Sequence, residues 1–165
     1  MFNIVFVEPE IPQNAGSTAR LCAAAGAALH LVGRLGFRTD SASVRRAGLD
    51  YWEHARVERH ESVEALRELA GADARFFYFS SSARRLYTDI RYAPGDYLVF
   101  GRESTGLPRD LLERNAGSCF RIPILPSVRS LNLATAAGIV LYEALRQQGF
   151  ESLAGSATET AAETR

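Results

Sequence analysis

The chain has 165 residues, of which 47% are hydrophobic and 23% are charged, proportions that are ordinary for one globular domain with an adequate core. Its 19 acidic and 19 basic residues balance, so no overall positive field indicates a nucleic-acid partner. No apolar run approaches the roughly 20 residues that span a membrane, and the start lacks the basic segment of a signal peptide. We therefore expect a cytoplasmic protein without membrane contact.

Apolar runs that alternate with helical patterns predict an α/β protein with a mainly parallel sheet. We expect one domain over residues 1–150, followed by a disordered tail over residues 151–165, where apolar side chains are few. Buried strands are predicted at residues 2–7, 28–32, 75–79, 97–100 and 119–122, with a weaker edge strand near 53–58. Helices are predicted from the N-cap Asn14 to Gly26, over 41–47, over 62–70 with Ser62 as cap, and from 133 to Gly149.

The segment over residues 122–149 has two unusual features. Pro123 and Pro126 favour an extended chain that is a poor central strand, and Ser127 or Ser130 is available to cap the helix that follows. Inside that helix, Gly138 costs roughly 1 kcal/mol relative to alanine, which suggests that another backbone comes close. A capped amphipathic helix packed on a sheet explains the rest of the segment without any function.

The loops that follow the strands are polar or rich in glycine at residues 8–20, 80–82, 101–106 and 127–132. Ligands of parallel sheets bind beyond the carboxyl ends of the strands, so these loops predict one continuous binding rim. Neither GxGxxG nor GxxxxGK[ST] follows a strand, so the fingerprints of dinucleotide and P-loop binding are missing. A flavodoxin-like nucleotide binder stays open as an alternative, although its phosphate loop is missing too.

Metal sites and histidine-based catalysis find no support in the residue spacing. His30 is expected to pack within a strand, His54 and His60 are expected in solvent, and the three occur in unrelated settings. The rim holds no histidine, so a Ser-His-Asp triad is not indicated. Cys22 and Cys119 stand far apart, which predicts reduced thiols rather than a disulfide or zinc framework.

Three motifs in order resemble those of the SPOUT superfamily, the RNA methyltransferases that use S-adenosylmethionine. They are N-x-G-x-x-x-R at Asn14, Gly16 and Arg20, LVFGRESTGLP over residues 98–108, and IPILPSVRSLNLATA over residues 122–136. The run over residues 3–26 and RRAGLDYWEH over 45–54 resemble the minimal members of its SpoU branch, the tRNA wobble-nucleotide (cytidine or uridine) 2′-O-methyltransferases. The resemblance covers about residues 2–150.

The resemblance implies a fold and a cofactor. The fold is an α/β sheet whose C-terminal segment forms a deep trefoil knot, and the cofactor is S-adenosylmethionine, with no metal. The family's cofactor contacts fall here on Phe79, Ser80, Gly101, Glu103, Ile122, Ser130 and Leu131. Phe79 is bulkier than the aliphatic residue usual in the family, and Glu103 would also suit the first turn of a helix.

Catalysis is assigned by the resemblance to Arg20, with Asn132 and Ser130 orienting the hydroxyl or the cofactor. A solvated cation on the surface of a helix is the alternative for Arg20.

The resemblance further implies two kinds of partner. One is a second copy of the chain, in a homodimer with a composite active site whose interface could include Leu21, Leu141 and Leu145. The other is the anticodon loop of tRNA. Every basic residue of the chain is an arginine, whose fork suits phosphate. The candidate RNA-binding residues are Arg45, Arg46, Arg84, Arg85 and Tyr142.

Two other functions remain open from the sequence. An enzyme of the same superfamily could act on ribosomal RNA or on another tRNA position. A non-catalytic RNA-binding module is the second alternative, and the presence of Arg20, Gly101, Ser130 and Asn132 together argues against it.

Overall fold

The computed structural model describes residues 1–38 and 54–154. Seven strands form one sheet in the order β3-β2-β1-β6-β4-β7-β5, and each of the six neighbouring pairs is parallel. This confirms the predicted α/β class with a mainly parallel sheet. The strands are β1 (Asn3–Val7), β2 (Ala28–Val32), β3 (Arg56–His60), β4 (Phe76–Phe79), β5 (Arg85–Leu86), β6 (Tyr97–Phe100) and β7 (Cys119–Arg121).

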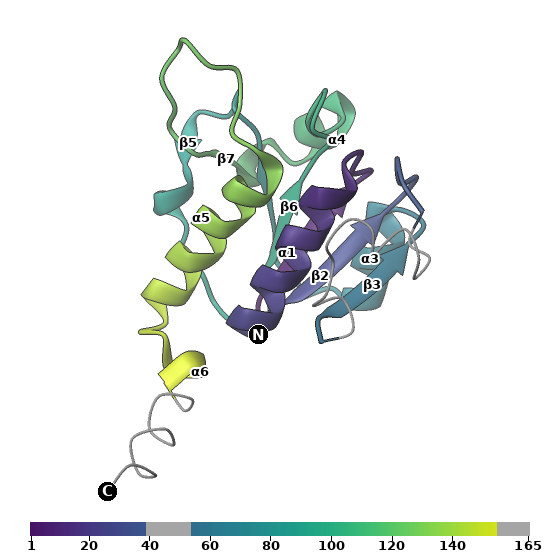
Figure 1. The fold of residues 1–165 in the computed structure, drawn as a ribbon. Helices are drawn as coiled ribbons and strands as arrows, with labels where there is room; N and C mark the ends of the chain where they lie inside the picture. The colour runs from purple at the N-terminus through teal and green to yellow at the C-terminus, as the bar shows by residue number, and fades with distance from the viewer. Residues whose placement is uncertain (39–53, 155–165) are drawn as a thin grey trace, which may run out of the picture.

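Helices cover both faces of the sheet. The long helices α1 (Pro12–Ala25) and α5 (Leu133–Gln147) lie side by side on one face, and α3 (Val63–Ala70) lies on the other (Figure 1). The short elements are α4 (Arg109–Arg114), α6 (Glu151–Ala154) and the 3-10 turns η1 (Tyr87–Asp89) and η2 (Ala116–Ser118). No helix in the described part of the chain is long and apolar enough to cross a bilayer.

Burial from both sides explains why β1 and β2 are almost continuously apolar. Alternate side chains of β1 enter two separate clusters: Ile4 and Phe6 pack toward α1 and α5, while Val5 and Val7 pack toward α3 and α4. The thiol of Cys22 is fully buried in the first cluster, which raises its pKa to about 12. Both cysteines are free, as predicted.

Helix ends follow the sequence signals only in part. Gly26 ends α1 in the left-handed conformation (φ 63°), and Ser62 caps α3 by accepting a hydrogen bond from the Ala65 N–H at 3.0 Å. The prediction of Asn14 as N-cap was wrong, because α1 begins at Pro12, a residue that suits the first helical position. Ser127 and Ser130 do not cap α5; the carboxamide of Asn132 does, by accepting from the Thr135 N–H at 3.2 Å.

Several short elements were missed or misplaced. The two-residue strand β5 closes one edge of the sheet, and α4 begins only after Pro108. Glu103 therefore lies in a turn and not in the first turn of a helix, contrary to one expectation. The short helix α6 occupies the first residues of the predicted tail. The predicted helix over residues 41–47 lies outside the described residues.

The packing of α1 on α5 overturns two expectations. A Cβ built on Gly138 would meet only the Leu21 Cδ2 within 4 Å, at 3.7 Å, so no other backbone crosses there within the described chain. Leu141 and Leu145 are 0% and 3% exposed in the core of the single chain. They cannot supply a dimer interface, because the helix directs them at the sheet.

Two histidines expected in unrelated settings meet in space. His30 on β2 and His60 on β3 lie with ring centroids 5.2 Å apart, and His60 is half-buried rather than in solvent. Adjacent parallel strands bring them together, since His30 pairs with Glu58 and Val32 with His60. His54 is exposed, as predicted.

A bidentate ion pair between Arg75 and Asp96 lies at the amino-terminal end of β4 and β6. Asp96, 2% exposed, accepts hydrogen bonds from the Arg75 Nε and Nη2 at 2.7 and 2.6 Å. The Ala93 N–H donates to the same carboxylate at 2.8 Å. The pair thus fixes the chain before β4 to the turn before β6.

We expect Arg75→Ala to lower the free energy of unfolding by roughly 2 kcal/mol, because a buried carboxylate loses its charged partner. Arg109→Ala is the control, since it breaks an ion pair with Glu113 whose side chains are 92% and 64% exposed. That exposed pair contributes about 0.5 kcal/mol or less. Urea unfolding followed by circular dichroism measures both, and equal losses would contradict the stabilising role of the Arg75 fork.

Candidate active site

A cavity of about 1030 Å³ opens beyond the carboxyl ends of β4, β6 and β7. Its volume is at the upper end of the range of about 300–1,000 Å³ for small-molecule sites. The residues that line it end or follow these three strands, lie at the start of α1 or α5, or belong to α4, so the rim predicted from the loops is confirmed. The main groups are residues 79–82, 100–107 and 129–133, with Ile11, Asn14, Arg109, Leu112, Ile122, Ile124 and Ala136.

All seven residues predicted to contact a cofactor line this cavity, and Asn132 does so too. Their individual roles stay predictions. Arg20 is not among the lining residues: it lies on α1, six residues beyond Asn14, with an exposed side chain. The structure therefore brings Ser130 and Asn132 together with the cofactor candidates but leaves Arg20 outside the cavity of its own chain.

The lining of the cavity combines apolar and polar residues. The ring of Phe79 stacks on that of Phe100, with centroids 4.8 Å apart and an interplanar angle of 16°. Ile122 and Leu131 are half-buried lining residues on the segment after β7. Hydroxyl groups face the same space from two loops and the segment before α5, at Ser80, Ser81, Ser82, Ser104, Thr105 and Ser130. The lining includes no histidine or cysteine, so the site favours binding and orientation over nucleophilic chemistry by the protein.

Gly101 is required by a close approach of two backbones. A Cβ at this position would stand 2.1 Å from both the Gly106 carbonyl carbon and the Leu107 nitrogen. The chain doubles back there, and Arg102 and Gly106 form an antiparallel bridge. The glycine thus makes the tight loop after β6, which forms one side of the cavity.

The loop after β6 is locked to the loop after β1 by hydrogen bonds that run in both directions. Glu103 accepts from the Glu10 and Ile11 N–H groups at 2.8 and 3.2 Å and from the Asn14 Nδ2 at 2.8 Å. In return, Glu10 accepts from the Ser104 hydroxyl at 2.9 Å and its N–H at 3.0 Å, contacts that lower the pKa of Glu10. An ion pair between Glu8 and Arg102 adds a third connection. We call these contacts between residues 8–14 and 102–104 the loop clamp.

The loop clamp extends to the third motif through Asn14. Its side-chain oxygen accepts a hydrogen bond from the Asn132 Nδ2 at 2.8 Å, and Asn14 is only 5% exposed. The chain of contacts Glu103–Asn14–Asn132 therefore joins all three motifs beside the cavity. Sequence reasoning missed this structural role of Asn14, although the residue opens the first motif.

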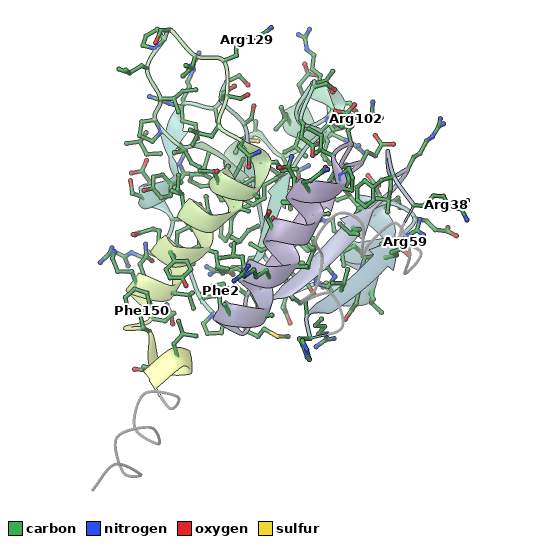
Figure 2. All side chains as sticks on the ribbon, in the orientation of Figure 1. Phe2, Arg38, Arg59, Arg102, Arg129 and Phe150 are labelled. Carbon is green, nitrogen blue, oxygen red and sulfur yellow. The ribbon has the colours of Figure 1, made fainter. Side chains whose placement is uncertain are left out.

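The sequence analysis did not single out all of the arginines that line the cavity. Arg102 and Arg129 both line the cavity, and Arg129 lies at the top of the molecule in Figure 2, away from Arg38 and Arg59 on the right. Arg129 is an exposed lining residue that the sequence did not single out.

The candidate RNA-binding residues occupy different settings. Arg84 is exposed in the loop between β4 and β5, and Arg85 lies over the Phe120 ring at 4.4 Å and donates to the Gly117 carbonyl at 2.8 Å. Tyr142 is 45% exposed on α5. The predicted residues Arg45 and Arg46 lie outside the described residues.

Residues 1–142 match the SpoU rRNA methylase family, and the chain belongs to that family. It is 46% identical over 153 residues to the tRNA (cytidine(34)-2′-O)-methyltransferase of Burkholderia ambifaria, which covers 92% of this chain and 98% of that protein. A relative of the same name from Saccharophagus degradans is 45% identical over 151 residues, covering 91% and 97% of the two chains.

The structures of known methyltransferases are also similar to that of this chain. A structure described as giving insight into the 2-OH methylation of C/U34 on tRNA aligns with a TM-score of 0.85 at 46% identity, covering 92% of this chain and 98% of that one. The SpoU methyltransferase AviRb of Streptomyces viridochromogenes, in complex with AdoMet, aligns with a TM-score of 0.75 at 27% identity. That alignment covers 90% of this chain and 60% of AviRb.

We expect Glu103→Gln to lower the free energy of unfolding by roughly 1–3 kcal/mol. The NH₂ group of the glutamine would face an N–H donor that accepts no hydrogen bond, where the wild-type protein has a carboxylate oxygen. Glu113→Gln is a matched control on an exposed side chain. Urea unfolding gives the stability of both variants, and calorimetry gives their affinity for S-adenosylmethionine. Unchanged values for Glu103→Gln would show that the loop clamp does not hold the cavity together.

Proposed function

We propose that this protein transfers a methyl group from S-adenosylmethionine to the ribose 2′-hydroxyl of the tRNA wobble nucleotide, cytidine or uridine 34. The observation that carries the proposal is the cavity at which three family motifs converge. The chain is also 46% identical, over nearly its whole length, to an enzyme named for this reaction.

The residues of the cavity fit S-adenosylmethionine. The apolar lining residues Phe79, Ile122 and Leu131 suit an adenine ring, and the hydroxyl groups of the lining suit the polar ends of the molecule. When bound, the cofactor supplies an electrophilic methyl group on a sulfonium. The loops after β4, β6 and β7 would hold the cofactor, and the loop clamp fixes the second of them directly and the end of the third through Asn132. Residues of the protein would orient the hydroxyl that attacks.

Arg20 is the proposed catalytic residue. A ribose hydroxyl is a weak nucleophile that loses its proton as it attacks, and a guanidinium can hold the adjacent phosphate and stabilise the developing negative charge. Arginine stays protonated, so it is not assigned as the base. Ser130 and Asn132 complete the proposed set, with Asn132 oriented by its hydrogen bond to Asn14.

The proposal includes a homodimer with a composite active site, which the position of Arg20 outside the cavity of its own chain supports. We place the interface on the outward faces of α1 and α5. Tyr142 and Phe150, 45% and 39% exposed with ring centroids 6.4 Å apart, supply apolar surface there. Half-buried Leu21 lies between the two helices and could extend it.

A trefoil knot is also part of the proposal. Strands β4 and β5 are joined by only five residues, 80–84, yet β7 lies between them in the sheet. The loop over residues 80–84 must therefore pass the end of β7, and the chain that leaves β7 toward α5 runs beside this loop. Such an arrangement supports threading of the C-terminal segment, which is exceptional among folds.

Transfer of labelled methyl from S-adenosylmethionine to tRNA of a strain that lacks this gene tests the reaction. We expect label in the 2′-O-methyl nucleotide at position 34 after nuclease digestion. Label at another position, or in ribosomal RNA only, would reassign the substrate within the family. Cofactor binding without transfer to any RNA would favour the non-catalytic alternative.

We expect Arg20→Ala to retain affinity for S-adenosylmethionine and to lose at least about 100-fold in turnover, since the charge stabilisation at the hydroxyl is removed. Arg114→Ala is the control, because Arg114 is an exposed residue of α4 whose ion pairs are with Glu64 and Asp110. Calorimetry and the methyl-transfer assay separate the two effects. A fully active Arg20→Ala protein would remove the residue from the mechanism.

A further inference from the structure

A cluster of three potential metal ligands lies at the edge of the sheet formed by β2 and β3. The His30 Nδ1 is 3.0 Å from the His60 Nε2, and the Glu58 Oε2 is 3.7 Å from the first nitrogen and 3.9 Å from the second. His30 is 4% exposed, and the side chains of His60 and Glu58 are 9% and 31% exposed. The residues that line the active-site cavity include none of the three.

The hydrogen bonds of Asn3 set the tautomer of His30. The Asn3 Nδ2 donates to the carbonyls of Gly95 and Asp96 at 3.2 and 3.4 Å, which directs its Oδ1 toward the His30 Nε2 at 3.2 Å. The assigned proton therefore lies on Nε2, and the Nδ1 lone pair is directed at His60. An oxygen that accepts from the second nitrogen is the usual outer partner of a metal-binding histidine.

The charge states also suit a cation. Burial lowers the pKa of His30 to about 4, so its ring is neutral at pH 7 and its lone pair is available. The Arg56 Nε donates to the Glu58 Oε1 at 2.6 Å, and this hydrogen bond lowers the pKa of Glu58. Its second oxygen, Oε2, is left facing the two histidines. Arg56 itself is 62% exposed, so water screens its repulsion of a metal ion.

We propose that His30 Nδ1, His60 Nε2 and Glu58 Oε2 bind one divalent transition-metal ion, with zinc as the first choice. A triangle with sides of 3.0, 3.7 and 3.9 Å has a circumradius of about 2.1 Å, which is the length of zinc bonds to imidazole nitrogen and carboxylate oxygen. One point is thus equidistant from all three atoms at a bonding distance. This proposal replaces the expectation, drawn from sequence spacing, that the protein has no metal site.

The ion ties the edge strand β3 to its neighbour β2. Two imidazoles and one carboxylate leave a fourth position for water, which the partial exposure of Glu58 makes accessible. The cavity that we assign to methyl transfer lies beyond β4, β6 and β7 instead. The metal therefore stabilises the edge of the sheet and takes no part in the reaction, and the proposal stands independently of the proposed function.

Zinc titration of chelator-treated full-length protein tests the site. We expect one zinc per chain by calorimetry, a higher Tm in its presence, and a visible absorption band of four-coordinate Co²⁺ when cobalt replaces zinc. Glu58→Gln and His60→Gln should each weaken zinc binding by at least about 10-fold. His54→Gln is the control, because it removes an exposed histidine from the same stretch and should bind like the wild type.

Two results would overturn the proposal. One is wild-type protein that takes up no stoichiometric zinc and shows no rise in Tm, which leaves a plain hydrogen bond between the two histidines. The other is zinc binding that Glu58→Gln does not weaken, which places the ion elsewhere. Glu58→Gln decides the question if His60→Gln fails to fold, since Glu58 is the most exposed of the three residues.

Discussion

The carboxylate of Glu103 is the contact on which the cavity depends. It accepts hydrogen bonds from two backbone N–H groups before α1 and from the side chain of Asn14, so one residue after β6 determines where the chain enters its first helix. The Ile11 N–H belongs to the N-cap of α1, a position that a helix leaves without an internal partner, and a carboxylate is a good partner for it. Through Asn14 the same contact fixes Asn132 and hence the start of α5. The positions of three loops that are distant in the sequence are thereby fixed relative to one another.

The sheet carries two polar regions with different roles. At the ends of its central and left-hand strands in Figure 1, backbone turns and hydroxyl groups surround an open cavity that suits an organic ligand. At its right-hand edge, where β3 pairs only with β2 within the described chain, two imidazoles lie within hydrogen-bonding range of each other. The Glu58 carboxylate lies 3.7 and 3.9 Å from their nitrogens. The first region is formed by loops and the second by side chains of the strands themselves. Neither needs the other in order to form.

Elements that depend on local patterns could be predicted from the sequence. Strands β1 and β2 are apolar because both faces are covered, and Ser62 and Gly26 act through neighbours in the chain. Features that depend on distant partners could not. The local sequence around Asn14 predicts a helix cap, because its hydrogen bonds with Glu103 and Asn132 cannot be inferred from neighbouring residues. Strand β5 has only two residues, too few to give a recognisable pattern, and is defined by its pairing with β7. His30 and His60 meet only because β3 pairs with β2 in one register.

The position of β1 also constrains how the polypeptide reaches its native state during synthesis. β1 pairs with β2 soon after both have emerged, but its other neighbour, β6, follows more than 90 residues later. The side chains of Glu8 and Glu10 likewise find their partners, Arg102 and Ser104, only at that stage. Closing such long loops is slow, because chain entropy is lost before the contacts form. Until β6 has been synthesised, the edge of β1 that later pairs with β6 stays unpaired. During this time a chaperone or another chain can bind the exposed apolar strand.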